Sequence, residues 1–355
     1  MDFIRSLIET LLRSLPFPTK TGLRVFGKPN QHSPVFVTAN FDLTVRRVAR
    51  VLTQNEIDCY LLVVNTKGIN VWCAAKGGHF TADQVVSAIK TSDIGGMVDH
   101  RQLVLPQLCA SGVNPKEIHD KTGWHAKFGP VYARYIPPYI KNGFQKTAKM
   151  NLVEFPLIQR LEMAAMWAFP MTILIGILFA ILWRNLLPAI VPLIWVLALL
   201  LFTLYFWLPG KPSLVTALVT GGMLAVGVAA FGLFASQWGI KDILILSLST
   251  VFIAGIIGID FPGSSPLFHS EWVIWTQERG LTKGPGRFKV AVNPEDCNGC
   301  GICVDVCPRG VYELDKETKK AIVSEAEKCE NCTACFKQCP EQAISIGTPV
   351  ENFYQ

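Results

Sequence analysis

The sequence predicts three parts of different fold class. An α/β domain is expected over residues 1–150, a domain of four transmembrane α-helices over residues 151–262, and an α+β domain rich in cysteine over residues 288–355. Residues 263–287, which repeat Pro and Gly, are expected to form a linker. Three observations predict this order: strand-like and helix-like patterns alternate in the first part, four apolar runs fill the second, and one cysteine spacing occurs twice in the last.

Composition narrows the class of protein. Hydrophobic residues make up 50% of the 355 residues, and their concentration in long runs indicates membrane insertion. Residues 1–160 carry 20 Lys and Arg against 11 Asp and Glu, whereas residues 288–355 carry 7 against 11. These opposite charges either favour docking of the two ends or are ordinary solvated surface. No basic cluster with interleaved aromatic residues occurs, so no nucleic-acid partner is expected.

Alternating elements predict a parallel α/β arrangement for the first part. Residues 16–34 are interpreted as a turn-rich entry, and residues 1–15 as an amphipathic helix that lies on a membrane surface or, as we favour, packs on its own domain. Thr81 is expected to cap a helix, and Cys59 and Cys109 are expected to be core residues. The expected elements are strands at 35–37, 60–64 and 103–105 and helices at 43–52 and 81–92.

Four apolar runs predict the transmembrane helices. They cover residues 163–183, 186–208, 213–235 and 240–259. At about 1.5 Å per residue, each run is long enough to cross a hydrocarbon core of about 30 Å. Basic residues gather before the first run and after the last, while the loops on the other side hold only Arg184 and Lys241. An even number of spans and the positive-inside rule therefore predict a multi-pass protein of the cytoplasmic membrane with both soluble ends in the cytoplasm.

Eight of the 11 cysteines follow one spacing that recurs 32 residues later. In each run two residues separate the first three cysteines, three residues precede the fourth, and a proline follows. This is the pattern of two-cluster bacterial ferredoxins, in which the fourth cysteine of each run ligates the other cluster. Zinc sites and disulfides are alternatives, but the spacing favours iron-sulfur clusters in a reducing compartment. The expected ligands are Cys297, Cys300, Cys303 and Cys339 for one 4Fe-4S cluster and Cys329, Cys332, Cys335 and Cys307 for the second.

A Trp-Cys pair lies between the strand predicted at 60–64 and the helix predicted at 81–92. Cys73 is thus expected past the carboxyl end of a strand, where α/β proteins usually bind ligands, although a lone cysteine is more often a small buried residue. The sequence lacks the Asp-x-His-x-x-Gly pattern by which many cobalamin proteins supply a histidine to cobalt. It also lacks phosphate-loop and zinc-peptidase motifs. The motif around the cysteine reads Asn70-Val71-Trp72-Cys73-Ala74-Ala75.

This motif resembles the cap helix of the corrinoid protein family of microbial mercury methylation, which is related to the corrinoid iron-sulfur protein of the acetyl-CoA pathway. Similar stretches at 37–40, 65–70, 105–108 and 128–131 extend the resemblance over about residues 34–140. One departure is that Lys76-Gly77 stands where the family pattern has Gly-Lys.

The resemblance implies a corrinoid-binding domain. Asn70, Val71, Trp72, Cys73, Ala74 and Ala75 would bind a cobalamin, and the Cys73 thiolate would ligate cobalt on the lower face. The implied partners are a folate-type methyl donor or its methyltransferase and a low-potential electron donor. Reduction of the cobalt to Co(I) by the clusters would prepare the cobalt to take the methyl group.

The expected function is a membrane-anchored, corrinoid-dependent methyltransferase of the mercury-methylation type, reduced by its own ferredoxin domain. Two alternatives stay open: a corrinoid protein of an acetyl-CoA-type pathway without mercury activity, and a corrinoid-free membrane electron-transfer protein. The family's separate ferredoxin has additional cysteines thought to hold mercury, which residues 348–355 here lack. Mercury methylation is therefore expected to be weak unless a partner supplies thiols.

Overall fold

The computed structural model describes residues 2–13, 15–204, 214–234, 238–260, 289–329 and 331–347. The chain divides into two compact units, each made of two pieces. The first unit combines Met1–Ser14 with Glu154–Pro285, and the second combines Leu15–Val153 with Gly286–Gln355. The predicted linker and the last eight residues, 348–355, lie outside the described residues.

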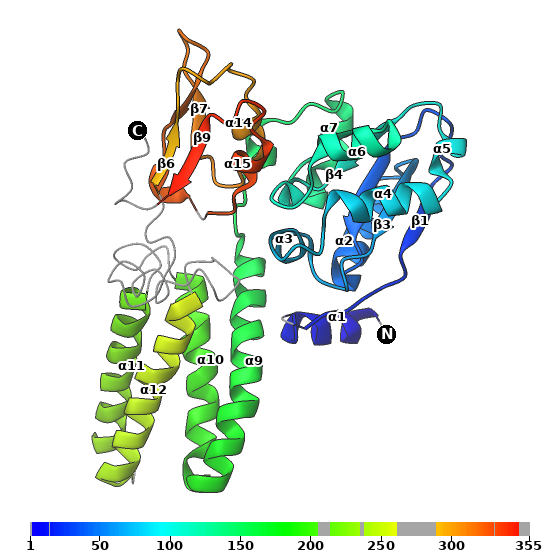
Figure 1. Cartoon of the computed structure of the whole chain (residues 1–355). Coiled ribbons are helices and arrows are strands. Elements are labelled where there is room, and N and C mark those ends of the chain that lie inside the picture. The colour runs from blue at the N-terminus through cyan, green and yellow to red at the C-terminus, as the bar shows by residue number, and fades with distance from the viewer. Residues whose placement is uncertain are drawn as a thin grey trace. The chain divides into compact units, whose positions relative to one another are not determined.

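The first unit contains four helices that are long and apolar enough to cross a membrane. They run antiparallel to their neighbours in the chain, with α9 paired with α10 and α11 with α12 (Figure 1). A Cβ atom at Gly221 would lie 2.3 Å from the Ala254 Cβ, so this glycine permits the close approach of α11 and α12. Each helix coincides with a predicted span, although α9 begins earlier than expected. The bounds are α9 (Leu157–Leu182), α10 (Leu187–Leu204), α11 (Leu214–Phe234) and α12 (Ile240–Asp260), with a 3-10 turn η3 (Arg184–Leu186) between α9 and α10.

The amino-terminal helix α1 (Asp2–Leu11) also belongs to the first unit. It packs against α9, and the Arg13 guanidinium lies 3.3 Å from a Glu162 carboxylate oxygen. Ile4 is 63% exposed, whereas Glu9 is 2% exposed and pairs with Arg5. The amphipathic helix is therefore confirmed, but the expectation that it packs on the α/β domain is wrong.

A five-stranded sheet forms the centre of the second unit. The strand order is β1-β3-β2-β4-β5, and every neighbouring pair is parallel except β1 and β3. The three predicted strands are β2, β3 and β4, whereas the two edge strands were not predicted. The edge strand β1 lies in the segment interpreted as turn-rich, and β5 exposes polar side chains that weaken an apolar pattern. The bounds are β1 (Gly22–Phe26), β2 (Val35–Ala39), β3 (Cys59–Val64), β4 (Gln102–Leu105) and β5 (His125–Phe128).

Alternate residues of each central strand pack against helices on opposite faces of this sheet. One face, with Leu62 and Leu103, packs against α3, α4 and α6; the other, with Leu61 and Val104, packs against α2 and α7 (Figure 1). Thr81 and Gln84 form a capping box at α4, which confirms the predicted cap. The helices are α2 (Asp42–Gln54), α3 (Val71–Lys76), α4 (Ala82–Thr91), α5 (Ile94–Met97), α6 (Pro115–Thr122), α7 (Ile136–Lys141) and α8 (Ala148–Asn151), with 3-10 turns η1 (Gln107–Cys109) and η2 (Ala133–Tyr135).

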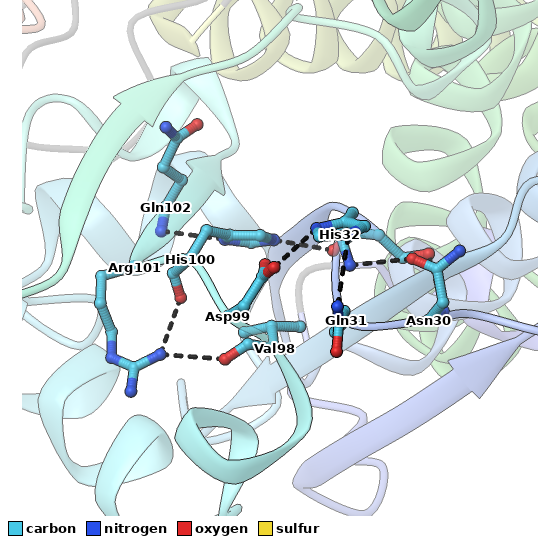
Figure 2. Close-up of polar contacts among 9 residues, drawn as sticks. Asn30, Gln31, His32, Val98, Asp99, His100, Arg101 and Gln102 are labelled. Atoms are coloured by element: carbon cyan, nitrogen blue, oxygen red, sulfur yellow. Dashed lines mark hydrogen bonds and ion pairs between the residues drawn. The ribbon is translucent and has the colours of Figure 1, made fainter.

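A polar network fastens the amino-terminal edge of the sheet (Figure 2). His32 Nδ1 lies 2.7 Å from an Asp99 carboxylate oxygen, which joins the segment before β2 to the segment before β4. His100 Nε2 lies 3.0 Å from the Ser33 carbonyl oxygen, and its Nδ1 accepts the Gln102 N–H at 3.2 Å. These contacts join the segments that precede β2 and β4 at the amino-terminal edge, opposite the carboxyl edge where parallel sheets usually bind ligands.

The cysteine-rich domain (residues 289–347) consists of two similar halves. Gly299 and Gly301 have positive φ angles, and so do Asn331 and Thr333, which occupy the same positions 32 residues later. The repeated backbone follows from the repeated cysteine spacing. Strand β6 pairs with β9 and β7 with β8, both antiparallel. The bounds are β6 (Lys289–Val292), α14 (Ile302–Val306), β7 (Tyr312–Leu314), β8 (Ala321–Val323), the 3-10 turn η5 (Ala326–Lys328), α15 (Ala334–Gln338) and β9 (Ile344–Gly347).

Candidate functional site

The stretches that carry the sequence resemblance gather at the carboxyl edge of the sheet. Residues 37–40 end β2, residues 65–70 follow β3, residues 105–108 end β4, and residues 128–131 end β5. Parallel strands bring their carboxyl ends together, so segments far apart in sequence become neighbours. The Gly129 N–H, for example, donates to the Leu105 carbonyl oxygen at 2.8 Å.

Asn40 fixes the loop that leads from β3 to Cys73. Its Oδ1 atom accepts hydrogen bonds from the backbone N–H groups of Thr66 and Gly68 at 2.8 and 2.9 Å. Asn40 is 4% exposed and Thr66 is fully buried, so these donors have no access to water. Gly68 has a φ of +71°, and a Cβ atom there would lie 2.4 Å from the Pro18 nitrogen. Asn40, which directly follows the neighbouring strand β2, and the tightly packed Gly68 therefore fix the course of this loop.

Asn70 holds Cys73 in two ways. Its Oδ1 atom caps α3 by accepting the Cys73 N–H at 3.0 Å, and its Nδ2 atom donates to the Cys73 sulfur at 3.3 Å. Cys73 is half-buried, whereas Cys59 and Cys109 are fully buried, as predicted for core residues. One asparagine thus fixes both the helix start and the direction of the only partly exposed thiol among these three.

Helix α3 has one buried side and one more open side. Val71, Ala74 and Ala75 are buried in the core beneath the sheet edge. Trp72 and Cys73 are half-buried on the other side. Among the residues predicted to bind a cofactor, Asn70 and Cys73 are in direct contact, while the three buried residues pack the helix onto the domain.

Gly112 packs closely against the backbone at the end of α3. A Cβ atom at this position would lie 2.4 Å from the Phe80 carbonyl oxygen and 2.6 Å from that of Ala75. Lys76, at the departure from the family pattern, is half-buried in the last turn of α3. Sequence reasoning missed Gly112; the signal was a glycine after the small residues Ala110 and Ser111.

The cysteine-rich domain gathers its thiols in two groups. Cys297, Cys300, Cys303 and Cys339 line one hollow together with Val292 and Ile344. The fourth cysteine of the second run is thus grouped with the first three of the first run.

The second group is centred on Cys335. Burial raises the pKa of Cys335 to about 12, although the hydrogen bond from Tyr312 acts in the opposite direction, and the nearby thiols of Cys332, Cys307 and Cys329 add to the increase. The Tyr312 hydroxyl donates to the Cys335 sulfur at 3.1 Å, and the Val311 N–H donates to the Cys307 sulfur at 3.4 Å. Donors aimed at sulfur stabilise the thiolate form that metal ligation needs.

Comparisons with known proteins match the first part of the chain and the cysteine-rich domain to two different families. Residues 5–140 match the CdhD family, described as "CO dehydrogenase/acetyl-CoA synthase delta subunit". Residues 296–343 match the 4Fe-4S dicluster domain. The chain contains a CdhD-like domain and a 4Fe-4S ferredoxin domain.

Three relatives of the CdhD-like domain are acetyl-CoA decarbonylase/synthase complex subunits gamma. The chain is 37% identical to that of Methanopyrus kandleri over 126 residues, 37% identical to that of Archaeoglobus fulgidus over 129, and 32% identical to that of Methanocaldococcus jannaschii over 134. These matches cover 36 to 38% of this chain and 27% of each relative. The chain therefore spans little more than a quarter of the length of these relatives.

Proposed function

We propose that the chain is a membrane-anchored corrinoid protein for methyl transfer that carries its own two-cluster ferredoxin. One observation supports this most directly. A CdhD-like domain holds a half-buried thiol at the carboxyl edge of its sheet, and the same compact unit contains both groups of four cysteines.

The residues around Cys73 suit a corrinoid with a thiolate ligand. A soft sulfur ligand is available at an edge where α/β proteins bind ligands, and Asn70 holds it in one direction. The bound corrinoid would supply a cobalt centre that accepts a methyl group and passes it on. Asn70, Asn40 and Gly112 would keep Cys73 in place while this occurs, because they fix the start, the preceding loop and the packing of α3.

The eight cysteines of the ferredoxin domain would hold two 4Fe-4S clusters, which supply single electrons at low potential. One cluster would take Cys297, Cys300, Cys303 and Cys339, and the other Cys329, Cys332, Cys335 and Cys307. The grouping of the first set around one hollow and the proximity of the second set support this assignment. Hydrogen bonds from Tyr312 and Val311 to sulfur would tune the potential of the second cluster.

Helices α9 to α12 would anchor the protein in the cytoplasmic membrane. Their length and composition suit a bilayer, and four spans would put both ends of the helical domain on one side. The excess of basic residues beside the outer ends of this domain favours the cytoplasm for both soluble domains. An attached electron donor must share a compartment with the site that it reduces.

The methyl acceptor is the point on which the two corrinoid alternatives differ. A mercury acceptor would need free soft thiols for delivery. Cys59 and Cys109 are fully buried, and the other eight cysteines besides Cys73 are assigned to clusters. This assignment of the cysteines and the similarity to acetyl-CoA decarbonylase/synthase gamma subunits favour the methyl acceptor of an acetyl-CoA-type pathway. Hg(II) is the second candidate.

Cobalt content and cobalt ligation test the proposal. The full chain, purified without oxygen and loaded with cobalamin, should contain both cobalt and iron. Replacing Cys73 by Ala should change the corrinoid absorption spectrum and leave the iron content unchanged, whereas Cys59→Ala, at a buried cysteine of a different core cluster, should change neither. Iron-sulfur absorption without any cobalt binding would instead favour the corrinoid-free electron-transfer protein.

Methyl transfer to Hg(II) separates the remaining alternatives. Membranes supplied with a methyl donor and a reductant should form little methylmercury. Strong methylmercury formation that is lost in Cys73→Ala would show that mercury is the acceptor after all.

A further inference from the structure

Residues 107–113, which follow β4 and are here called the docking platform, lie between the Cys73 helix and the ferredoxin domain. On one side, η1 packs against α3, and Gly112 touches the backbone of Ala75. On the other side, Cys109, Ala110 and Val113 belong to the same buried cluster as Cys303 and Cys335. The platform is therefore a shared layer between two parts of the second unit.

Helix α15 binds the backbone of the platform. Gln338 Nε2 donates to the carbonyl oxygens of Ala110 and Val113 at 2.7 and 2.8 Å. Lys337 Nζ donates to the Ser111 carbonyl oxygen at 2.7 Å. Buried carbonyl groups need partners, and these three receive them from one turn of the ferredoxin domain.

Helix α14 is held by a second set of polar contacts. Lys146 Nζ donates to the Asp305 backbone oxygen at 2.9 Å and lies 3.0 Å from its carboxylate. The same ammonium lies 3.4 Å from Gln107 Oε1, at the start of the platform. The Lys146 side chain is only 4% exposed, whereas that of Asp305 is 45% exposed, so the ammonium is shielded from water while the carboxylate is partly open to it.

The contact residues alternate with the predicted cluster ligands. Asp305 lies between Cys303 and Cys307, and Gln338 lies between Cys335 and Cys339. Each of these cysteine pairs contributes one member to each group of four. The contacts therefore hold both groups of four cysteines in position relative to the platform. Because Gly112 of the platform packs on α3, they also hold both groups relative to α3.

We propose that residues 107–113 dock the ferredoxin domain in one fixed position against the Cys73 helix, with Gln338 and Lys146 as positioning residues. The inference rests on the proposed function in one respect, the purpose of the docking. That purpose would be to keep the electron-supplying groups at a constant distance from the corrinoid site. The docking itself is a property of the chain and is measurable without any corrinoid.

Hydrogen exchange of the full chain with its clusters assembled tests the docking. In Gln338→Met, which keeps length and neutrality but removes both donors, amides in the platform should exchange at least about ten-fold faster. Gln145→Met, at an exposed position, is the matched control and should leave exchange unchanged. Unchanged exchange in Gln338→Met, with iron content intact, would overturn the docking role.

Lys146 provides the same test from a residue outside the ferredoxin domain. Lys146→Met should also speed exchange in the platform, whereas Lys146→Arg, which keeps donors for Asp305, should restore slow exchange. Lys141→Met, at an exposed position on α7, is the matched control. If Lys146→Met and Lys146→Arg behave alike, Lys146 is not a positioning residue.

Alkylation of Cys73 tests whether docking reaches α3. Loosening the platform in Gln338→Met should change the rate of Cys73 alkylation about three-fold or more in corrinoid-free protein, and the control should not. A constant rate would overturn the link to α3. A chain that binds no corrinoid but shows both effects would refute the proposed function and leave the docking intact.

Discussion

The CdhD-like domain and the ferredoxin domain both depend on thiols, but they position them by different means. In the ferredoxin domain, all eight cysteines lie within two short runs, and the backbone around them repeats after 32 residues. In the CdhD-like domain, one thiol depends on Asn40 from another strand and on Gly112 from another loop. A group of many cysteines can be encoded by local spacing, whereas the position of a single thiol depends on contacts between distant segments.

The difference affects the surroundings as well. Ferredoxin thiols such as those of Cys297, Cys307 and Cys335 accept hydrogen bonds from a backbone N–H group or a tyrosine. Cys73 accepts its bond from the amide of Asn70, which also caps the helix. Replacing Asn70 would therefore remove both the cap of α3 and the hydrogen bond to the Cys73 sulfur.

The sharpest test of this comparison is the reactivity of the three thiols in the CdhD-like domain. In cluster-loaded protein without corrinoid, N-ethylmaleimide should alkylate Cys73 about 100-fold faster than Cys59 or Cys109. Burial raises the pKa of Cys59 to about 12, with a smaller effect of Asp58, and raises that of Cys109 well above its usual range. Peptide mass spectrometry after timed quenching gives the rates, and comparable labelling of Cys59 would contradict the assignment of a single accessible thiol.

A change at Asn40 should disturb Cys73 from a distance and leave the clusters alone. Asn40→Ala leaves the buried N–H groups of Thr66 and Gly68 without their acceptor, which should lower the free energy of unfolding of this domain by about 2–3 kcal/mol. Urea-dependent alkylation of the buried Cys109 reports this free energy. Asn65→Ala, which removes the acceptor of the exposed Lys67 N–H at 3.0 Å in the same loop, is the control; equal losses in both variants would show that burial of the Asn40 hydrogen bonds is not the cause.

Alkaline pH should weaken the CdhD-like domain through Cys59. Its pKa is higher in the folded state than the ordinary 9.0, so the folded state holds the proton more tightly and the resulting stability is present below pH 9. That stability is lost as the pH rises from 9 towards about 12, with a loss of about 1.4 kcal/mol at pH 10.

Urea midpoints measured by fluorescence between pH 8 and pH 10 check this effect. The decline should be shallower in Cys59→Ala than in the parent chain. Parallel curves for Cys59→Ala and the parent would mean that Cys59 does not titrate in this range.

Much of the fold followed from sequence because periodic patterns are local. The central strands β2, β3 and β4, the capped helix α4 and the four apolar helices were all expected. The edge strands β1 and β5 were missed because an edge strand has one partner and one open side, which permits exposed residues such as Val25. The placement of α1 was missed because an amphipathic pattern specifies a buried side but not the element that covers it.

The candidate site was predictable only in part, for the same reason. The position of Cys73 past a strand and its partner Asn70 are close in sequence. Asn40, Gly112 and the platform contacts of Gln338 join residues 26 to more than 200 positions apart. No local pattern marks such contacts, and the opposite charges of the two ends did not specify which residues would pair, as Lys146 does with Asp305.

The two compact units alternate along the chain, with residues 1–14 and 154–285 in one and residues 15–153 and 286–355 in the other. This order constrains biosynthesis, because domains fold as they leave the ribosome from the amino end. The CdhD-like domain is complete before the first apolar helix has been made, but its partner domain emerges only after all four have been translated. A chain whose translation stops early can therefore present Cys73 but lacks all eight cysteines of the two runs, so the ribosome delivers the ferredoxin domain last.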